Sequence, residues 1–483
     1  MKTDILIAGS GCSGLYAAWN LPRDKQILLI TKRDLETNDS FLAQGGMCVL
    51  QNEEDYESYF EDTLKAGHYE NDKESVEIMI RSSQNVLKDL IFLGARFARN
   101  ADGSLDYTRE GGHSRERIVY HKDVTGKEIT SHLLEAVKKL DNVTLVEYTK
   151  LIDLVEQDNV CYGAVVRKSK DTRITRGGQP LTWEEAGFDT ELLEKIEADV
   201  TILATGGIGG LYRHSTNFRH LTGDGLAMAI RHKIALKDIN YVQIHPTTFY
   251  SDCEEDRSFL ISESVRGEGA RLYDKNMQRF VDELIPRDLL TAAIREQMAK
   301  DGTVHVWEDM RPIGEKEQKL HFPNIVAHAA EKGYDTTKEC IPVVPAQHYF
   351  MGGIKVNHES ATSMGRLYAV GETACNGVHG RNRLASNSLL ESMVFAKRAA
   401  QDIVKHYEEG KFSDQDADAA TVEALFARVD LSVYHDDDAI TEEYRRIVRD
   451  AIKKADESSA DFKDEEDYRK IQESKRKNTE NES

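Results

Sequence analysis

The sequence predicts an α/β fold that opens on a parallel sheet, and three observations carry this prediction. Residues 5–8 form an apolar run, the glycine-rich stretch 9–14 follows it directly, and a second apolar run occupies residues 27–30. Apolar runs without polar alternation are typical of strands that are covered on both faces, as in parallel sheets. Residues 15–21 are expected to be helical up to Pro22, because proline ends a helix.

Helical patterns and extended patterns then follow one another along the chain. Two helices are expected within residues 58–97, the second over 75–93, and another helix is expected over 130–140. Residues 143–166 are rich in valine and threonine, which favours short strands.

The polar stretch 168–197 interrupts this alternation and is expected to be a surface insertion of unassigned role, with an acidic helical piece at 191–197. Strands are expected over 199–204 and 366–370, each leading into a glycine, and a helix over 387–405.

Composition limits the classes of protein and the kinds of partner. The 483 residues include 84 acidic and 63 basic ones, for a net charge of −21. This balance argues against binding nucleic acid over the whole surface. No apolar run approaches the roughly 20 residues of a membrane span, and the start lacks a secretory pattern, so a cytoplasmic protein is expected. The six cysteines form no CxxC pair, which predicts free thiols and no metal site.

The C-terminal segment 406–483 differs from the rest of the chain. It holds 23 acidic and 13 basic residues, and its apolar positions thin out after Val448. One or two helices are expected there, followed from about Asp456 by a disordered or frayed end.

The glycine cluster between the first strand and helix predicts a dinucleotide site. Gly9 permits the tight turn, Gly11 lets the backbone approach a pyrophosphate, and Gly14 allows close packing of helix and strand. An acidic residue for the ribose usually ends the second strand, but Thr31 and Lys32 stand there instead. Thr31 could still bind a ribose, and Lys32 could reach adenosine or phosphate.

Three further glycine-bearing stretches, at 43–46, 204–207 and 370–372, suit a long cofactor held by dispersed segments. FAD fits this pattern better than NAD.

Seven motifs, in order along the chain, resemble the succinate dehydrogenase/fumarate reductase flavoprotein family. They are residues 4–15 with the glycine cluster, Ala43-Gln44-Gly45-Gly46, Thr222-Gly223-Asp224-Gly225, Gln243-Ile244-His245-Pro246-Thr247, Arg266-Gly267-Glu268-Gly269, Pro286-Arg287-Asp288 and Ala385-Ser386-Asn387-Ser388-Leu389-Leu390-Glu391. The resemblance implies an FAD-binding Rossmann-like domain interrupted by an α+β capping domain, with a shortened C-terminal helical segment. The implied division is 1–236 and 345–405 for the FAD-binding domain, 237–344 for the capping domain and 406–483 for the C-terminal segment.

Within this family, residues 108–114 (TREGGHS) and 345–349 (PAQHY) resemble the branch that oxidises L-aspartate. The implied reaction gives iminoaspartate, and the electrons pass through FAD to O₂, giving hydrogen peroxide, or to fumarate, giving succinate. Iminoaspartate would feed quinolinate synthesis, which implies functional coupling to quinolinate synthase and a place in NAD biosynthesis.

The resemblance also implies which residues act. The implied catalytic residues are Arg287, Glu110, His245, Glu263 and Arg266. The implied substrate-binding residues are His348, Arg383, Ser262 and Gln243. The implied cofactor-binding residues are Gly9, Ser10, Gly11, Cys12, Ser13, Gly14, Lys32, Asp39, Ser40, Gln44, Gly45, Gly46, Ala204, Thr205, Gly206, Asp224, Glu372, Asn387, Ser388 and Leu389. Glu110 would bind the substrate ammonium, and Arg287 would transfer a proton through a relay of Glu263 and Arg266.

Asp39 occupies the position where respiratory members carry the histidine that attaches FAD covalently, so non-covalent FAD is expected. Two alternatives stay open: a soluble fumarate reductase or succinate dehydrogenase flavoprotein, and a non-catalytic FAD-binding protein. The expected partner is a small dicarboxylate, with neither nucleic acid nor a membrane. The sequence leaves open the preferred electron acceptor and whether the chain is a monomer or a homo-oligomer.

Overall fold

The computed structural model describes residues 1–212, 214–251, 257–412 and 419–456. Its largest sheet has the order β15-β8-β1-β2-β5-β6-β7, in which β15, β8, β1, β2 and β5 run parallel to one another and β6 runs antiparallel to β5 and β8. The strands are β1 (Lys2–Ala8), β2 (Ile27–Ile30), β5 (Val143–Gln157), β6 (Val160–Arg176), β7 (Gln179–Leu181), β8 (Leu193–Leu203) and β15 (Leu367–Ala369). The predicted α/β fold on a parallel sheet is confirmed.

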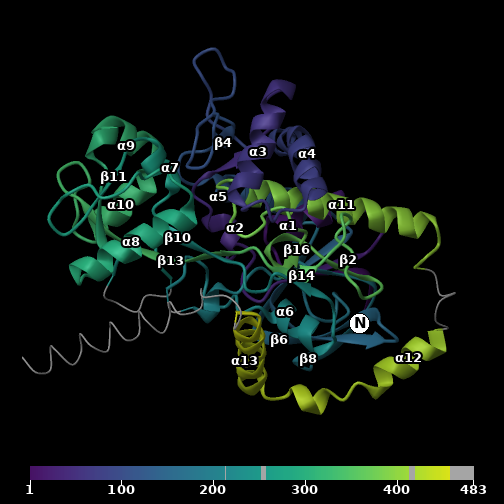
Figure 1. Ribbon diagram of the computed structural model, residues 1–483. Coiled ribbons are helices and arrows are strands. Elements are labelled where there is room, and N and C mark those ends of the chain that lie inside the picture. The colour runs from purple at the N-terminus through teal and green to yellow at the C-terminus, as the bar shows by residue number, and fades with distance from the viewer. Residues whose placement is uncertain (213, 252–256, 413–418, 457–483) are drawn as a thin grey trace, which may run out of the picture.

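Helices cover both faces of this sheet (Figure 1). One face packs against α1 (Cys12–Asn20), α4 (Lys73–Phe92), α5 (Thr125–Lys138) and the long α11 (Ser388–Glu408). On the other face lies α6 (Asp224–Arg231), which packs against α13 (Asp437–Asp456). The continuous apolar strands β1 and β2 are therefore buried on both sides, as their sequence requires.

A second, antiparallel sheet has the order β10-β13-β12-β11 and its own core. Its strands are β10 (Val242–Phe249), β11 (Arg271–Tyr273), β12 (Val306–Asp309) and β13 (Ile341–Phe350), and its helices are α7 (Glu263–Gly267), α8 (Arg287–Asp301), α9 (Glu315–His321) and α10 (Pro323–Glu331). Figure 1 shows these elements gathered at one side of the molecule, at a distance from the long helix α11. This α+β unit matches the expected capping fold, while the domain boundaries stay a prediction.

The remaining described elements are mostly short. The strands are β3 (Gly46–Cys48), β4 (Ile118–Tyr120), β9 (Leu236–Lys237), β14 (Gly353–Lys355) and β16 (Ala374–Cys375). The helices are α2 (Asp39–Leu42), α3 (Tyr56–Ala66) and α12 (Ala419–Arg428), and single helical turns lie at η1 (Glu53–Asp55), η2 (Gly209–Leu211), η3 (Arg311–Ile313), η4 (Gly371–Thr373) and η5 (Leu431–Tyr434).

The stretch 168–197 corrects the sequence prediction. The expected helical piece at 191–197 is wrong, because Leu193 begins strand β8, which pairs with β6. Glu194 is buried there and accepts from Lys168 Nζ at 2.9 Å. The pairing of β6 with β8 and this buried ion pair override the helical propensity of the glutamates.

The C-terminal segment forms two helices, α12 and α13, among the described residues, as expected. The predicted frayed end beyond Asp456 lies outside the described residues. None of the described helices is long and apolar enough to cross a membrane.

Candidate active site

A long cavity with about 1650 Å³ of empty space lies between the carboxyl ends of the parallel strands and the second sheet. Segments far apart in the sequence line it, drawn from 8–13, 30–32, 37–46, 204–206 and 386–389. Ligands of open α/β sheets bind at this edge, outside the carboxyl ends of the strands.

The glycine turn at the head of α1 requires its glycines for close packing. A Cβ on Gly9, whose φ is +125°, would lie 2.0 Å from the carbonyl oxygen of Ala204. A Cβ on Gly14 would lie 2.1 Å from the carbonyl oxygen of Gly9. Gly11 lines the cavity. The turn therefore presents its backbone and the start of α1 to a ligand, the arrangement that binds phosphate groups.

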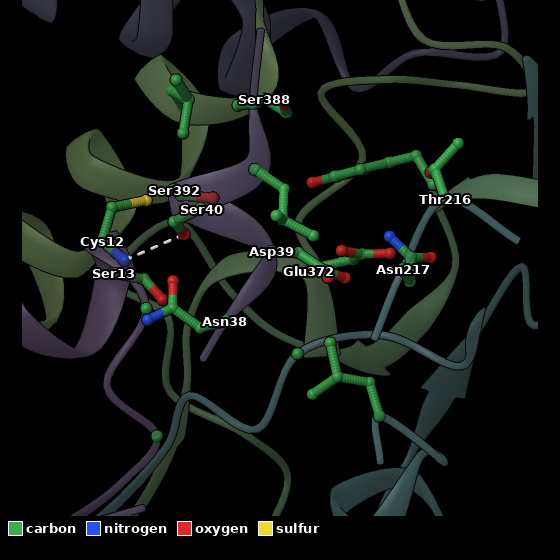
Figure 2. A pocket seen from close by; sticks show the side chains of 18 of the residues that line it. Cys12, Ser13, Asn38, Asp39, Ser40, Thr216, Asn217, Glu372, Ser388 and Ser392 are labelled. Atoms are coloured by element: carbon green, nitrogen blue, oxygen red, sulfur yellow. Dashed lines mark hydrogen bonds between the residues drawn. The ribbon is translucent and has the colours of Figure 1, made fainter. Parts of the chain in front are cut away.

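Hydrogen bonds hold the segment before and within α2 against this turn (Figure 2). The backbone N–H of Cys12 donates to Ser40 Oγ at 3.0 Å. Asn38 donates to the carbonyl oxygen of Ser10 at 3.3 Å and caps α2 by accepting from the Phe41 N–H. Gln44 lines the cavity nearby, and its buried Oε1 has no hydrogen-bond partner within the described chain.

Two half-buried acidic residues, Asp39 and Glu372, lie together in the cavity wall (Figure 2). Burial raises the pKa of Asp39 to about 7, and burial together with the Asp39 charge raises the pKa of Glu372 to about 8. Asp39 Oδ1 accepts from the Phe218 N–H at 3.0 Å, whereas its buried Oδ2 has no hydrogen-bond partner among the described residues. Such unpaired polar atoms are expected where a polar ligand completes the site.

Another part of the cavity wall supplies the acid that the end of β2 lacks. Asp224, the first residue of α6, accepts from Lys32 Nζ at 2.8 Å, and both side chains line the cavity. Burial opposes ionisation of Asp224, but Lys32 outweighs it and lowers the pKa of the carboxyl. A carboxylate is the usual partner of ribose hydroxyls in dinucleotide sites. The glycine turn, this carboxylate and the unpaired polar atoms together fit FAD.

Two arginines meet at the end of the cavity nearest the second sheet. Arg287 begins α8, and its Nη1 donates to Gln243 Oε1 at 2.9 Å. Arg383 Nε donates to the same oxygen at 3.3 Å, and its Nη1 donates to Ser388 Oγ at 2.7 Å. Gln243 Nε2 is fixed in turn by the carbonyl oxygen of Arg383 at 2.8 Å. Burial and the Arg287 charge lower the pKa of Arg383 to about 10.

A chain of charged groups runs from Arg287 into the second unit. Arg287 Nε donates to Glu263 Oε2 at 2.5 Å, and Arg266 Nη2 lies 3.9 Å from the same oxygen. All three side chains are buried. Burial opposes ionisation of Glu263, but Arg287 and Arg266 outweigh it and lower its pKa. The predicted relay residues are therefore adjacent in the structure.

Two histidines, His245 on β10 and His348 on β13, face the arginines with ring centroids 5.0 Å apart. Burial lowers the pKa of both, with Arg287 next for His245 and Arg383 next for His348. Both are therefore neutral at pH 7. His245 Nε2 is buried without a hydrogen-bond partner within the described chain, whereas Thr216 Oγ1 lies 2.7 Å from His348 Nδ1.

Glu110 brings an anion to this cationic wall. Its Oε1 accepts from Ser264 Oγ at 2.6 Å and its Oε2 from Ser386 Oγ at 2.5 Å. The side chain is only 3% exposed, and burial together with the Glu263 charge raises its pKa. A bound cation would favour the ionised form of such a carboxyl group.

A buried ion cluster that the sequence did not predict supports the loop of Glu110. Arg117 is fully buried and donates to Asp55 Oδ1 at 2.9 Å and to Asp62 Oδ2 at 2.7 Å. Asp62 also accepts from the Ser114 N–H at 2.8 Å. This cluster fixes the loop on α3, and its signal in the sequence is only scattered charges.

The structure brings most of the predicted site residues to the cavity wall. Four of them do not line it: Gly14, Asn387, Gln243 and Arg266. Gly14 packs beneath the glycine turn and Asn387 accepts from Tyr59 Oη, while Gln243 and Arg266 support their neighbours. Lining residues that the sequence did not single out include Asn38, Thr216, Asn217 and Ser392. They carry no motif, because each enters the wall through chain folding alone.

Known proteins are similar to this chain in sequence and in fold. A family model described as FAD binding domain matches residues 4–389. The L-aspartate oxidase of Clostridium perfringens is 48% identical over 400 residues, which cover 83% of this chain and 86% of that protein. The L-aspartate oxidase of Clostridium acetobutylicum is 45% identical, with 83% and 88% covered.

A solved structure of a mutant of E. coli quinol fumarate reductase has a TM-score of 0.77 at 28% identity, covering 88% of this chain and 73% of that one. A flavocytochrome c₃ fumarate reductase in an open conformation has a TM-score of 0.62 at 26% identity, with 84% and 78% covered. These matches agree with the fold and with FAD as the cofactor. The chain is therefore a member of the L-aspartate oxidase family, within the succinate dehydrogenase/fumarate reductase flavoproteins.

Proposed function

We propose that this chain oxidises L-aspartate to iminoaspartate and passes the electrons to O₂, giving hydrogen peroxide, or to fumarate, giving succinate. One observation carries the choice of substrate: the Glu110 carboxyl lies in the same cavity wall as Arg287 and Arg383. A dicarboxylate requires hydrogen-bond donors at both ends, and an amino group requires an acceptor between them. An amino dicarboxylate matches this pattern of charges better than a dicarboxylate alone.

Arg383 and Arg287 bind the substrate carboxylates in this proposal. A guanidinium is suited to this role because its planar fork matches the two oxygens of a carboxylate. His245 presents Nε2, which is buried without a hydrogen-bond partner among the described residues, while its Nδ1 lies 2.9 Å from the carbonyl oxygen and 3.2 Å from the backbone nitrogen of Thr247. His348 and Ser262 lie in the same wall and complete the set of donors.

Glu110 binds the substrate ammonium. Ser264 and Ser386 hold its two oxygens in place, so the carboxylate is oriented before the substrate arrives. The approaching ammonium lowers the raised pKa of Glu110 and so favours the charged pair.

Bound FAD supplies the redox chemistry, taking two electrons from the substrate and returning them to O₂ or fumarate. The side chains of this chain supply positioning and proton handling. Glu263 and Gln243 bind Nε and Nη1 of Arg287, so we assign Nη2 to the substrate. When fumarate is the acceptor, this nitrogen gives one proton to a substrate carbon, and Glu263 with Arg266 restores it.

Three further points belong to the same proposal. We place the activity in the cytoplasm, where the buried, unpaired thiols of the described cysteines suit a reducing compartment. The unstable product would pass to quinolinate synthase in NAD biosynthesis.

The α+β unit acts as the capping domain between residues 237 and 344.

Anaerobic mixing of the FAD-loaded protein with L-aspartate tests the proposal. We expect the flavin absorbance to bleach with L-aspartate, and iminoaspartate to be trapped as its hydrolysis products oxaloacetate and ammonia. Bleaching by succinate but not by L-aspartate would identify a succinate dehydrogenase or fumarate reductase instead. Bleaching by neither substrate, in protein that retains FAD, would indicate a non-catalytic FAD-binding protein.

A further inference from the structure

A second cavity, with about 1090 Å³ of empty space, lies against the outer side of the substrate site. Its wall comes from the end of α3 within 62–66, the loop 109–114, the turn 284–287 before α8, and residues 382–385. These segments belong to both structural units, so the second cavity lies where the α+β unit meets the FAD-binding unit.

The two cavities share a partition of four side chains. Glu110, Glu263, Arg287 and Arg383 line both of them. They are the same charged groups to which the proposed function assigns substrate binding and proton transfer. The second cavity therefore reaches the substrate position without being lined by the glycine turn.

The position expected for FAD limits the ways in which a substrate can reach the partition. The first cavity extends from the glycine turn to the partition, and FAD fits along it. A substrate that arrives after FAD has bound needs another way to the partition. The second cavity is the described space that supplies it, because it meets the same four side chains without passing the cofactor-binding segments.

The mouth of the second cavity carries uncompensated positive charge. Lys65 and Arg109 both line it and are exposed, and neither pairs with a carboxylate among the described residues. Two acidic groups of the wall are neutralised, since Asp62 pairs with Arg117 at 2.7 Å and Glu263 with Arg287 at 2.5 Å. This local positive charge is notable in a chain with a net charge of −21.

We propose that the second cavity is the entrance vestibule for dicarboxylates, and that Lys65 and Arg109 steer these anions to the partition. The inference rests on the proposed function for the identity of the ligand. Lys65 and Arg109 are steering residues whose charges attract the anion both in the vestibule and at the partition behind it, and the catalytic steps stay with the partition. Charges of one sign at the mouth of a cleft raise the local concentration of oppositely charged ligands and the rate of their association.

Electrostatic steering makes binding depend on the charge of the ligand and on the salt concentration, whereas a purely structural role does not. Fumarate carries two negative charges, whereas L-aspartate carries a net charge of one. Because the interaction energy scales with ligand charge, the factor lost for fumarate should be about the square of the factor lost for L-aspartate. Both losses should disappear at high salt, where the Debye length falls to about 3 Å at 1 M.

The test compares the double variant Lys65→Gln/Arg109→Gln with the control Lys127→Gln/Lys453→Gln, whose lysines are also exposed but line neither cavity. Two quantities are measured on FAD-loaded protein: kcat/KM for L-aspartate, and the Kd of fumarate from its perturbation of the oxidised flavin spectrum. At low salt we expect about a 3-fold loss for L-aspartate and about a 10-fold weaker Kd for fumarate. We expect kcat and the FAD affinity to be unchanged, and the control to behave as the unmodified protein.

Equal losses for the two ligands, losses that persist in 0.5 M salt, or a double variant that matches the control would overturn the proposal. The fumarate arm separates this inference from the proposed function. If the unmodified protein binds fumarate but its flavin is not reduced by L-aspartate, the proposed function fails, and the effect of the double variant on the Kd and its salt dependence still decides whether the vestibule exists.

Discussion

Glu110 and Arg287 share one cavity wall but take different partners. Ser264 and Ser386 hold the carboxyl group of Glu110, while Glu263 and Gln243 hold the guanidinium of Arg287. The anion and the cation therefore stay available for a ligand that carries both charges. This separation explains how a single site can bind an ammonium and a carboxylate of the same small molecule.

Gln243 should matter for substrate binding although it does not line the cavity. Its Oε1 accepts from both Arg287 and Arg383, so Gln243→Ala removes the group that holds the two guanidiniums in register. We expect KM for L-aspartate to rise about 10-fold, because one hydrogen bond to a charged group contributes about 1.5–3 kcal/mol. Steady-state kinetics measures this change, and an FAD titration serves as the control. A weakened FAD affinity with unchanged KM would contradict this role.

Glu263 should matter most when fumarate is the acceptor. Glu263→Gln keeps the size of the side chain but removes the charge that pairs with Arg287 at 2.5 Å. Loss of a positioned proton-transfer group typically costs 10²–10⁴-fold in rate, so we expect fumarate reduction to fall by about that factor. Single-turnover mixing of reduced protein with fumarate measures it. A similar fall in reoxidation by O₂ would point to general damage to the site rather than to proton transfer.

Flavin should be released completely when the protein is denatured. Asp39 faces the cavity where respiratory relatives are expected to carry the histidine that attaches FAD. A carboxyl group does not form that bond, and the raised pKa of Asp39 makes it a weaker anion still. We expect all the flavin in the supernatant after acid precipitation, detected as FAD by its absorbance. Flavin retained in the pellet would show a covalent link elsewhere.

Glu308 makes stability depend on pH. It is fully buried on β12, both its oxygens lack hydrogen-bond partners among the described residues, and burial raises its pKa to about 7. A raised carboxyl pKa gives stability that is complete below the unfolded value and is lost as pH rises through 7. We therefore compare the free energy of unfolding of Glu308→Leu with that of the unmodified protein. We expect this difference to rise in favour of the variant by up to about 3 kcal/mol as the pH goes from 4.5 to 8. Urea unfolding at both pH values measures this gain.

The exposed Glu331 provides the matched control for that experiment. Glu331→Leu should change stability by the same small amount at both pH values, because an exposed carboxyl keeps nearly the same environment on unfolding. If Glu308→Leu shows no change with pH either, Glu308 remains ionised in the folded protein.

The sequence predicted those parts of the molecule that local patterns determine. The strands at the N-terminus and the turn at Gly9 follow from apolar runs and backbone geometry within a few residues. The helical piece at 191–197 failed, because a buried pair between Glu194 and Lys168, 26 residues apart, decides that segment. Local propensity cannot anticipate such a contact.

The residues of the candidate site also divide into those that local motifs predict and those that only long-range contacts bring together. Arg287, Arg383 and Glu110 were predicted because they belong to motifs, and the structure brings them to one wall. The cluster around Arg117 and the second cavity were not predicted, since both exist only where separate chain segments meet.

The most direct test of the account is the ratio of two activities in Glu110→Gln. This change keeps the shape of the side chain and one accepting oxygen for Ser264 or Ser386, turns the other contact into one in which the amide donates, and removes the charge that faces the substrate ammonium. Anaerobic stopped-flow mixing should measure flavin reduction by L-aspartate and, separately, reoxidation of the reduced protein by fumarate. We predict that reduction by L-aspartate falls about 100-fold or more, the cost of an unpaired buried ammonium, while reoxidation by fumarate changes less than about 3-fold. Equal losses in both reactions would contradict the assignment of Glu110 to the amino group.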